Sequence, residues 1–389
     1  MKSRTLFIFV VSGLALSFWI YNIIKLTEFG KKVEEIGVNN LDCHKLDYRN
    51  PIEDFVKINE TFIIGSSFDV LHLFHDMDYL DPNKKVPNGA MVAYDLNTNK
   101  LYEIKINNFP KDIPFHPHGI DLFQDIYLFV INHSFSHTNS QERIELLSIN
   151  FSNNKVITLD YIKTFLLPQN HFGTSNALTA ISLSTFYVSS SYPFPMPLNS
   201  KEDSFFRRAK YKYGPALSII FNLKLCGTYL YNEGKLTLIK ETKGIMNNGI
   251  VYDEDRNLIY VSQTVDKKFM IFDISKDFKK PKSIKTVISN YAFDNLFLDK
   301  KNKKIYACII GSLLEHQSVV NSYLKYKDLN HVDKFYGGYE VIDITNNDKV
   351  EIIHLSNKKL IGISSGMDIG NKQILSACFE NGLLVCKKH

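Results

Sequence analysis

Two apolar runs, Ile250-Val-Tyr-Asp253 and Leu258-Ile-Tyr-Val261, flank the polar segment Glu254-Asp-Arg-Asn257. Short runs of β-branched and aromatic residues on either side of turn-forming residues are typical of β-hairpins. The same arrangement recurs along the sequence at residues 91–104, 145–159, 227–239, 295–307 and 338–353. Two motifs alternate along the chain: a strand, a polar turn and a strand ending in Asp-Leu or Asp-Ile, and a strand reading Gly-Ile-Val-Tyr-Asp or Asn-Leu-Phe-Leu-Asp. Each pair of motifs recurs about every 40 to 55 residues, which is the spacing of four-stranded propeller blades. We therefore predict an all-β chain that forms a β-propeller of about six blades.

An array of β-sandwich domains is the alternative fold, but it explains the regular spacing less well and needs linkers that the sequence does not show. One long insertion, from Pro193 to Leu223, departs from the hairpin pattern. It is proline-rich at first, then aromatic and basic, and finally apolar. This composition predicts a helical insertion that is either a lid or membrane-facing element, or an ordinary surface helix.

The composition indicates a globular protein and argues against one class of partner. The chain has 389 residues, of which 44% are hydrophobic and 13% aromatic, with a net charge of +5. Lysine and acidic residues alternate along the chain, and no basic block or aromatic-basic motif stands out. We therefore expect no nucleic-acid partner.

The N-terminus predicts a membrane segment. Basic residues in Met1–Arg4 precede an almost entirely apolar run from Leu6 to Ile24, which is long enough to cross a hydrocarbon core of about 30 Å. A cleaved signal peptide is the alternative, because Gly13-Leu14-Ala15 resembles a cleavage site. We favour an uncleaved signal anchor, since Phe18-Trp19-Ile20 continue the apolar run past that point. The positive-inside bias then places the large domain in the lumen or outside the cell.

The predicted organisation is an anchor at residues 1–24, a stem at 25–42 and a propeller at 43–389. The five cysteines show no metal-binding spacing. A disulfide between Cys43 and Cys386 would tie the two ends of the propeller together in an oxidising compartment. Sequons for glycosylation occur at Asn59, Asn132 and Asn150.

Oxygen-bearing side chains recur at the starts of the predicted inner strands. The inner strands of a propeller all border one central channel, so side chains that open several of these strands converge at one end of it. Carboxylate and amide oxygens are the ligands that Ca²⁺ prefers. The residues at these positions are Glu53, Asp54, Asn176, Asn248, Asp294 and Asn295. A calcium site follows from this placement, although scattered Asp and Asn residues are more often turn formers.

Several motifs resemble those of the paraoxonase/arylesterase family over about residues 43 to 386. The motifs are Ile52-Glu53-Asp54-Phe55, Phe115-His116-Pro117-His118-Gly119-Ile120, Val130-Ile131-Asn132-His133, Ser175-Asn176, Asn248-Gly249-Ile250, Phe293-Asp294-Asn295, Cys308 and Cys386. The resemblance implies a calcium-dependent, six-bladed propeller with arylesterase or lactonase activity. It also implies that the hydrophobic N-terminus stays attached.

The resemblance assigns roles to individual residues. It implies that His118 and His133 form a catalytic dyad and that Cys43 and Cys386 form a disulfide. The residues that it implies as ligands of a catalytic calcium are Glu53, Asn176, Asn248, Asp294 and Asn295.

Two positions depart from the family pattern. The second, buried calcium of the family uses the residue matching Asp54, a backbone carbonyl near Ile120, and an Asp where this chain has Ala177. We therefore expect the second calcium site to be weak or empty. The family's Asp-His pair is replaced by residues within Ser190-Ser191-Tyr192, which alters the wall of the substrate site.

Hydrolysis of a carboxylic ester or lactone is the activity that the resemblance implies. Ca²⁺ would polarise the carbonyl, His118 would take a proton from water, and His133 would orient His118. The alternative is a non-enzymatic, membrane-anchored accessory or chaperone protein for membrane proteins such as ion channels. Both readings expect a chain held in the membrane by its N-terminal helix with the propeller in the ER lumen or outside the cell, and cleavage of that helix would give a secreted form.

Overall fold

The computed structural model describes residues 16–17, 19–21, 24, 33–37, 41–74, 86–134, 142–152, 155–168, 173–195, 205–332, 335–343, 349–356 and 360–388. Strands dominate these residues, and in every unit of the fold consecutive strands pair antiparallel. This confirms the prediction of an all-β chain.

The strands form repeating units of four. The first strands of the units are β2 (Ile52–Lys57), β6 (Pro117–Phe123), β10 (Thr174–Ser182), β14 (Asn247–Asp253), β18 (Ala292–Asp299) and β22 (Ile363–Ile369). The second strands are β3 (Phe62–Ser67), β7 (Tyr127–Asn132), β11 (Thr185–Tyr192), β15 (Leu258–Gln263), β19 (Lys304–Ile310) and β23 (Lys372–Ala377). The third strands are β4 (Ala90–Asp95), β8 (Arg143–Ser152), β12 (Cys226–Asn232), β16 (Lys268–Asp273), β20 (Gly337–Asp343) and β24 (Leu383–Lys388). The fourth strands are β5 (Lys100–Asn107), β9 (Lys155–Leu166), β13 (Lys235–Gly244), β17 (Lys282–Ile288), β21 (Lys349–Ser356) and β1 (Leu41–Leu46).

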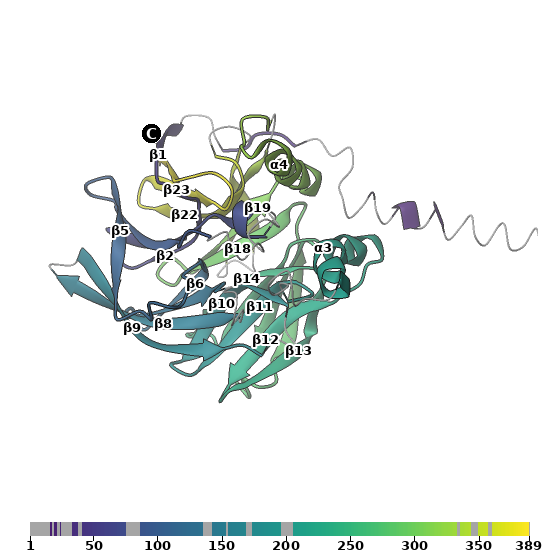
Figure 1. Ribbon diagram of the computed structural model, residues 1–389, viewed down its shortest axis with the longest axis horizontal. Helices are drawn as coiled ribbons and strands as arrows, with labels where there is room; N and C mark the ends of the chain where they lie inside the picture. The colour runs from purple at the N-terminus through teal and green to yellow at the C-terminus, as the bar shows by residue number, and fades with distance from the viewer. Residues whose placement is uncertain are drawn as a thin grey trace, which may run out of the picture.

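The units are arranged in a ring. Each first strand contacts the first strand of the next unit, from β2 through β6, β10, β14 and β18 to β22, and β22 contacts β2 again. In Figure 1 these first strands surround the middle of the molecule, whereas fourth strands such as β5, β9 and β13 lie towards the rim. A closed ring of four-stranded antiparallel sheets is the arrangement of a β-propeller.

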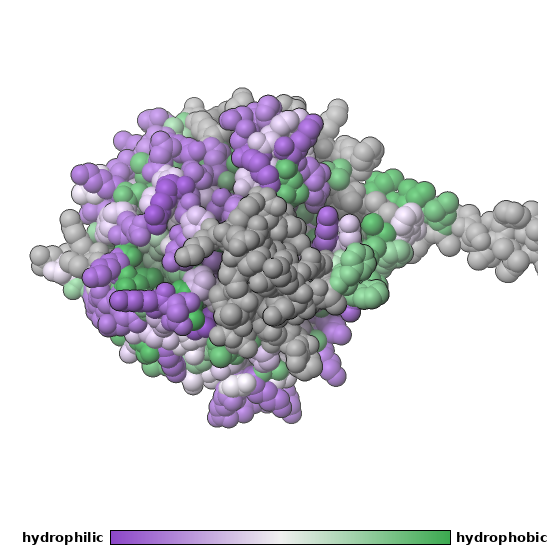
Figure 2. Space-filling model, in the orientation of Figure 1, coloured by the Kyte–Doolittle hydropathy of each residue, from purple (hydrophilic) through white to green (hydrophobic). Residues whose placement is uncertain are grey.

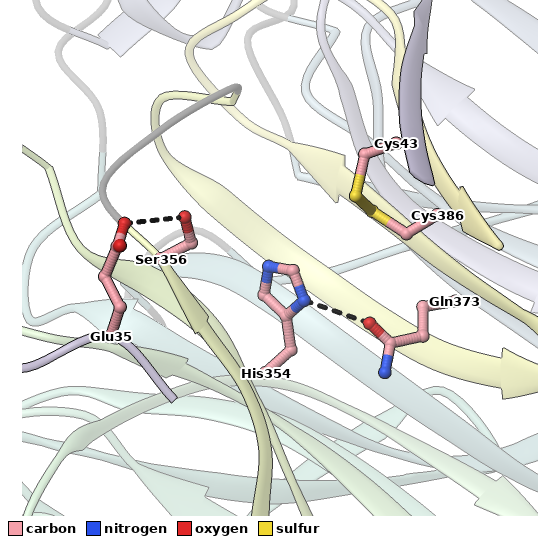
Figure 3. The surroundings of a disulfide bond; sticks show 6 residues. All are labelled: Glu35, Cys43, His354, Ser356, Gln373 and Cys386. Atoms are coloured by element: carbon pink, nitrogen blue, oxygen red, sulfur yellow. Dashed lines mark hydrogen bonds between the residues drawn. A yellow bond between two sulfur atoms is a disulfide. The ribbon is translucent and has the colours of Figure 1, made fainter. Parts of the chain in front are cut away.

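The two ends of the ring are joined by the last blade. β1, from the start of the domain, pairs with β24 from its end, and the register sets Cys43 opposite Cys386. These two residues form a disulfide (Figure 3). The predicted Cys43–Cys386 bridge is therefore confirmed.

Aromatic side chains fill the space between neighbouring blades. Phe165 of β9, Phe186 of β11 and Tyr231 of β12 belong to one buried cluster, in which the rings of Phe186 and Tyr231 stack with centroids 4.6 Å apart. Phe165 meets Phe186 edge-on at 5.3 Å. Each such aromatic pair contributes about 0.5–1.5 kcal/mol beyond the burial of its area. The apolar runs of the sequence thus become the packing between the blades.

Three helices share one hydrophobic cluster. They are α2 (Val70–Phe74), α3 (Phe205–Ile220) and α4 (Leu313–Tyr326). The cluster contains Val70 of α2, Tyr211 of α3 and Val319 of α4, together with Phe68. The helices therefore pack as one layer on the propeller. The helix predicted in the insertion from Pro193 to Leu223 is confirmed by α3, whereas α4 was not predicted.

Exposed apolar side chains gather near α3. They are Phe205, Phe206, Tyr213, Leu217 and Phe221 in or next to this helix, and Leu16, Trp19, Ile20, Tyr21 and Ile24 in the N-terminal segment. The two groups meet, because Trp19 donates a hydrogen bond of 3.0 Å to the carbonyl of Ile220. Figure 2 shows hydrophobic surface at this edge of the molecule.

The predicted anchor at Leu6–Ile24 lies largely outside the described residues. Within the part of the chain that the structure describes, no helix has both the length and the apolar character needed to cross a membrane. Of the predicted stem, residues 33–37 are described, and Ile36 forms a β-bridge with Leu355.

Candidate active site

The first strand of every blade has a β-bulge at its beginning. Regular pairing with the second strand is interrupted between Ile52 and Asp54, Pro117 and Ile120, Ser175 and Leu178, Asn247 and Ile250, Phe293 and Leu296, and Ile363 and Ser365. A bulge removes residues from the ladder and redirects their side chains, and bulges are common next to active sites. The interrupted positions hold Glu53, His118, Asn176, Asn248, Asp294 and Asn295. The prediction put the oxygen-bearing residues of this set directly before their strands, whereas they lie within the first residues of β2, β10, β14 and β18.

Two glycines allow the bulged strands to approach each other closely. A Cβ atom at Gly119 of β6 would lie 2.2 Å from the carbonyl oxygen of Asn176 in β10. A Cβ atom at Gly249 of β14 would lie 2.5 Å from the backbone nitrogen of Leu296 in β18. No side chain fits at these distances. Glycine is therefore required where these strands approach each other and bring the site residues close together.

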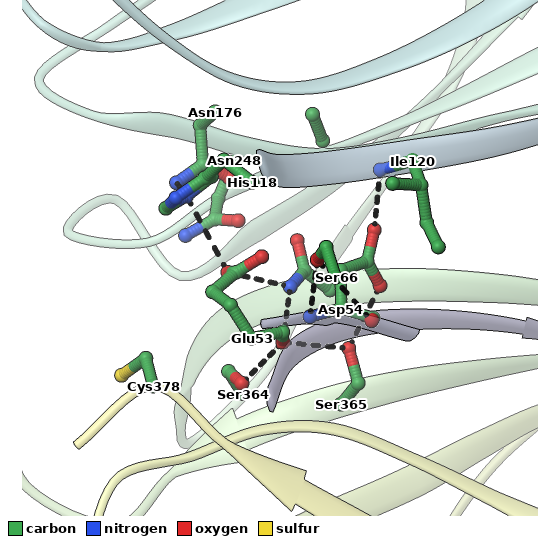
Figure 4. A network of polar contacts seen from close by, with 12 residues as sticks. Glu53, Asp54, Ser66, His118, Ile120, Asn176, Asn248, Ser364, Ser365 and Cys378 are labelled. Atoms are coloured by element: carbon green, nitrogen blue, oxygen red, sulfur yellow. Dashed lines mark hydrogen bonds and ion pairs between the residues drawn. The ribbon is translucent and has the colours of Figure 1, made fainter. Parts of the chain in front are cut away.

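The side chains of the predicted ligands form one buried network (Figure 4). Asn295 donates from Nδ2 to Oε1 of Glu53 at 2.9 Å. The same Glu53 oxygen lies 3.5 Å from Nε2 of His118, which is 3.3 Å from Nδ2 of Asn176. Asp294 interacts with Asn248 through a side-chain hydrogen bond. The structure therefore brings together all five residues expected to bind the first calcium.

Four oxygens of this network are buried and have no hydrogen-bond partner among the described residues. They are Oε2 of Glu53 and the Oδ1 atoms of Asn176, Asn248 and Asn295. An unsatisfied buried acceptor costs about 1–3 kcal/mol, so four in one place call for a ligand. Carboxylate and amide oxygens without sulfur or imidazole match the preference of Ca²⁺. The described residues contain no group of three or more His, Cys, Asp or Glu placed to hold a metal, and amides supply most of the donors here.

The electrostatics of the network also fit a cation. Burial raises the pKa of Glu53 well above its usual range, and the nearby carboxyls of Asp54 and Asp294 raise it further. Burial likewise raises the pKa of Asp294 to about 7. Negative charge is therefore uncompensated by protein groups at this point, and a bound cation reverses such shifts.

Asp54 has a different environment. Its Oδ2 accepts a hydrogen bond of 3.0 Å from the backbone nitrogen of Ile120, and its Oδ1 accepts from Phe55 N at 2.8 Å and from Ser365 Oγ at 2.9 Å. Asp54 thus links β2 to β6 and β22 through ordinary hydrogen bonds. Ala177 contributes no oxygen from its side chain. These contacts support the expectation that a second calcium site at Asp54 and Ile120 is weak or empty, which stays a prediction.

His118 and His133 lie side by side, and both are buried. Their rings meet edge to face with centroids 4.9 Å apart, and the ring of Phe68 covers them at 5.7 Å and 6.1 Å. Burial, followed by the neighbouring His133, lowers the pKa of His118 well below its usual range. The His118 ring is therefore neutral at neutral pH and can accept a proton.

A hydrogen-bonded frame fixes the backbone on which His133 sits. The backbone nitrogen of His133 donates to the carbonyl of His116 at 3.1 Å, and His116 N donates to Oδ1 of Asn132 at 2.8 Å. Nδ2 of Asn132 donates to Glu145 at 2.9 Å and to Pro114 O at 3.0 Å.

Asn132 is fully buried and both ends of its amide are engaged in that frame. Burial therefore argues against a glycan on the Asn132 sequon in the folded chain, because a buried amide is inaccessible. The other two sequon residues, Asn59 and Asn150, are partly exposed.

One residue of the site, Glu142, was not predicted from the sequence. Both carboxylate oxygens of Glu142 lie near Nδ1 of His133, at 3.1 Å and 3.2 Å, and Ser175 donates a hydrogen bond to the same carboxylate. Glu142 belongs to no motif. The signal that could have found it is the β7–β8 hairpin, whose register sets Asn132 opposite Arg143 and hence His133 opposite Glu142.

Cys308 lies beneath the network as an inert thiol. Its Sγ donates to the carbonyls of Gly338 and Ile363 at 3.2 Å and 3.3 Å, and it is fully buried. Burial raises the pKa of the Cys308 thiol well above its usual range. A protonated, buried thiol is a poor nucleophile, so Cys308 serves packing.

The fold and site together define a β-propeller with a buried, oxygen-rich centre beside two histidines. A sequence model of the arylesterase family matches residues 74–311, and the chain belongs to this family. The family that the motifs resemble is thereby confirmed.

Among solved structures, a luciferin-regenerating enzyme aligns with 89% of this chain and 95% of its own, at 9% identity and a TM-score of 0.46. The major allergen Mala s 1 of Malassezia sympodialis aligns with 90% of this chain and 96% of its own, at 9% identity and a TM-score of 0.48. A search of the curated proteins gives no match.

Proposed function

We propose that the protein is a calcium-dependent hydrolase of carboxylic esters or lactones. The observation that carries this proposal is the set of four buried, unpartnered oxygens beside a neutral histidine, His118. Membership of the arylesterase family supports ester hydrolysis as the reaction class.

The calcium would be held by residues from four blades, namely Glu53, Asn176, Asn248, Asp294 and Asn295. When bound, Ca²⁺ polarises a carbonyl oxygen and stabilises the negative charge that develops on it. The bulges of β2, β10, β14 and β18 aim these side chains at one point, and the blades hold them rigidly.

His118 acts as the general base in this mechanism. It takes a proton from a water molecule, and the water oxygen forms a bond to the carbonyl carbon of the substrate. The bond from that carbon to the leaving oxygen then breaks, and the proton returns from His118 to the leaving group. Phe68 covers the rings of His118 and His133 and excludes bulk water from them.

The proposed function is tested with the full-length protein purified in detergent. Initial rates are measured on aliphatic lactones and aryl esters in millimolar calcium, after EDTA, and after calcium is restored. We expect hydrolysis that EDTA abolishes and calcium restores. Absence of hydrolysis across the panel, with calcium bound, would overturn the proposal and favour an accessory role at membrane proteins.

We also propose that the chain is held in a membrane by Leu6–Ile24, with the propeller in the ER lumen or outside the cell. Two observations support this location: the disulfide between Cys43 and Cys386 suits an oxidising compartment, and apolar side chains of α3 are exposed beside Trp19. Alkaline carbonate extraction tests it, because an anchored chain stays in the membrane pellet. Release of the intact chain would contradict it.

A further inference from the structure

We propose that Glu142 is a positioning residue that fixes the tautomer and orientation of His133 and thereby supports His118 as the base. The catalytic part of this inference rests on the proposed hydrolase function. The orientation of His133 by Glu142 does not, and it can be measured separately.

The contact itself defines which nitrogen carries the proton. An ionised carboxylate only accepts hydrogen bonds, so Nδ1 of His133, at 3.1 Å and 3.2 Å from the Glu142 oxygens, must be the donor. A neutral imidazole has one N–H, and its other nitrogen is an acceptor. Glu142 therefore selects the tautomer in which Nε2 of His133 presents a lone pair.

The two rings are placed so that the lone pair on Nε2 of His133 can interact with His118. The His118 and His133 rings lie edge to face with centroids 4.9 Å apart, so the two imidazoles are direct neighbours. When His118 takes a proton from water, an O–H bond breaks and an N–H bond forms, which leaves the imidazole positively charged. His133, held by an anionic partner, can accept a hydrogen bond from that imidazolium and stabilise it.

The Glu142 carboxylate is a buried, hydrogen-bonded part of the site and not a chance surface contact. Glu142 is 6% exposed and His133 is 0% exposed, and a buried carboxylate is costly without donors. The second donor is the hydroxyl of Ser175, which directly precedes the proposed ligand Asn176 in β10. The carboxylate thus ties the β7–β8 hairpin, where His133 lies, to the strand that carries a ligand.

Among the described residues, the carboxylate at Nδ1 of His133 is that of Glu142, whereas the carboxylate near Nε2 of His118 is that of Glu53. We infer that Glu142 supplies the negative charge at His133 in this chain.

The experiment compares Glu142→Gln and Glu142→Asp in the full-length protein. A matched control is Glu340→Gln, the same substitution at a glutamate that is also buried but lies in β20, on another blade than His133 and Glu142. In ¹⁵N-histidine-labelled protein, we expect His133 to show a protonated Nδ1 and an unprotonated Nε2, and Glu142→Gln to change that spectrum. Glu340→Gln should leave it unchanged.

Kinetics give the second readout. We expect Glu142→Gln to lower kcat about 10²-fold or more with little change in KM, while calcium affinity measured by calorimetry is retained. Glu142→Asp should recover part of the loss, since the charge is kept. Ser175→Ala keeps the carboxylate but removes one donor, so its kcat should lie between those of the two Glu142 variants. It replaces Glu142→Gln in the test if that variant does not fold.

The outcomes separate the two proposals. If the wild type is active and Glu142→Gln leaves both kcat and the His133 spectrum unchanged, the inference about Glu142 is overturned. If the wild type hydrolyses nothing, the proposed function fails, and the spectrum alone decides whether Glu142 orients His133.

Discussion

Asn295 and Glu53 are 242 positions apart in the sequence, and Nδ2 of Asn295 donates a hydrogen bond of 2.9 Å to Oε1 of Glu53. The bond determines how each side chain faces the site. It engages Nδ2 of Asn295 and Oε1 of Glu53, and the other two side-chain atoms, Oδ1 of Asn295 and Oε2 of Glu53, are buried with no hydrogen-bond partner among the described residues. A pair of residues from the first and fifth blades thus offers two oxygens to one point, which is what a calcium site requires.

Removal of Asp294 should abolish tight calcium binding. Asp294→Ala takes one of only two carboxylates from the proposed ligands, and charge is a main determinant of calcium affinity. Asp299→Ala is the control, because Asp299 lies at the other end of β18 and binds Asn302 instead. Isothermal calorimetry should show loss of binding in the first variant only. Equal affinity in the two variants would refute the ligand assignment.

A carboxylate at position 177 should create a second calcium site. Asp54 and Ile120 lie together, but the side chain of Ala177 offers no oxygen. Ala177→Asp should therefore raise the melting temperature in millimolar calcium, since an ion bound only to the folded state stabilises it by about 2.7 kcal/mol at a hundredfold excess over Kd. Ala177→Asn is the uncharged control. A melting temperature that does not respond to calcium in Ala177→Asp would contradict this.

The stability of the fold should fall with rising pH because of Glu340. Burial raises the pKa of Glu340 from 4.5 to about 7, and Ser289 offsets this only in part. The folded state then holds a proton that the unfolded state releases above pH 4.5, so the contribution is complete below about pH 4.5 and is lost as the pH rises through 7.

Glu340→Gln removes this dependence. In urea unfolding, the free energy of unfolding of the variant should exceed that of the wild type by little at pH 4.5 and by up to about 3 kcal/mol at pH 8. Each pKa unit corresponds to about 1.4 kcal/mol. A difference between the two proteins that is the same at both pH values would show that Glu340 does not titrate in this range.

Periodicity explains why so much of the fold could be predicted. Hairpins such as the one around Glu254 repeat, and β-hairpin repeats of this length are typical of propeller blades. The same reasoning found Glu53, Asn176, Asn248, Asp294 and Asn295, because equivalent positions of a repeat must meet at its axis.

Features that depend on contacts between strands or on burial could not be predicted from the sequence. Glu142 meets His133 through the register of a hairpin, and its side chain carries no local pattern. Asn132 looked like a glycan acceptor because a sequon takes no account of burial, whereas the folded chain uses its amide to hold His116. Helix α4 was not predicted because only two of its residues, Val319 and Val320, are buried, which leaves a weak helical pattern of apolar residues in the sequence.

The role of His118 as the general base is measured by the rate of ester and lactone hydrolysis in His118→Gln, relative to the wild type and to His133→Gln. A general base contributes about 10²- to 10⁴-fold to the rate, so His118→Gln should lose most of the activity while calcium binding and the melting temperature persist. His133→Gln should lose less, because His133 acts through His118. A fully active His118→Gln protein with calcium bound would contradict the account.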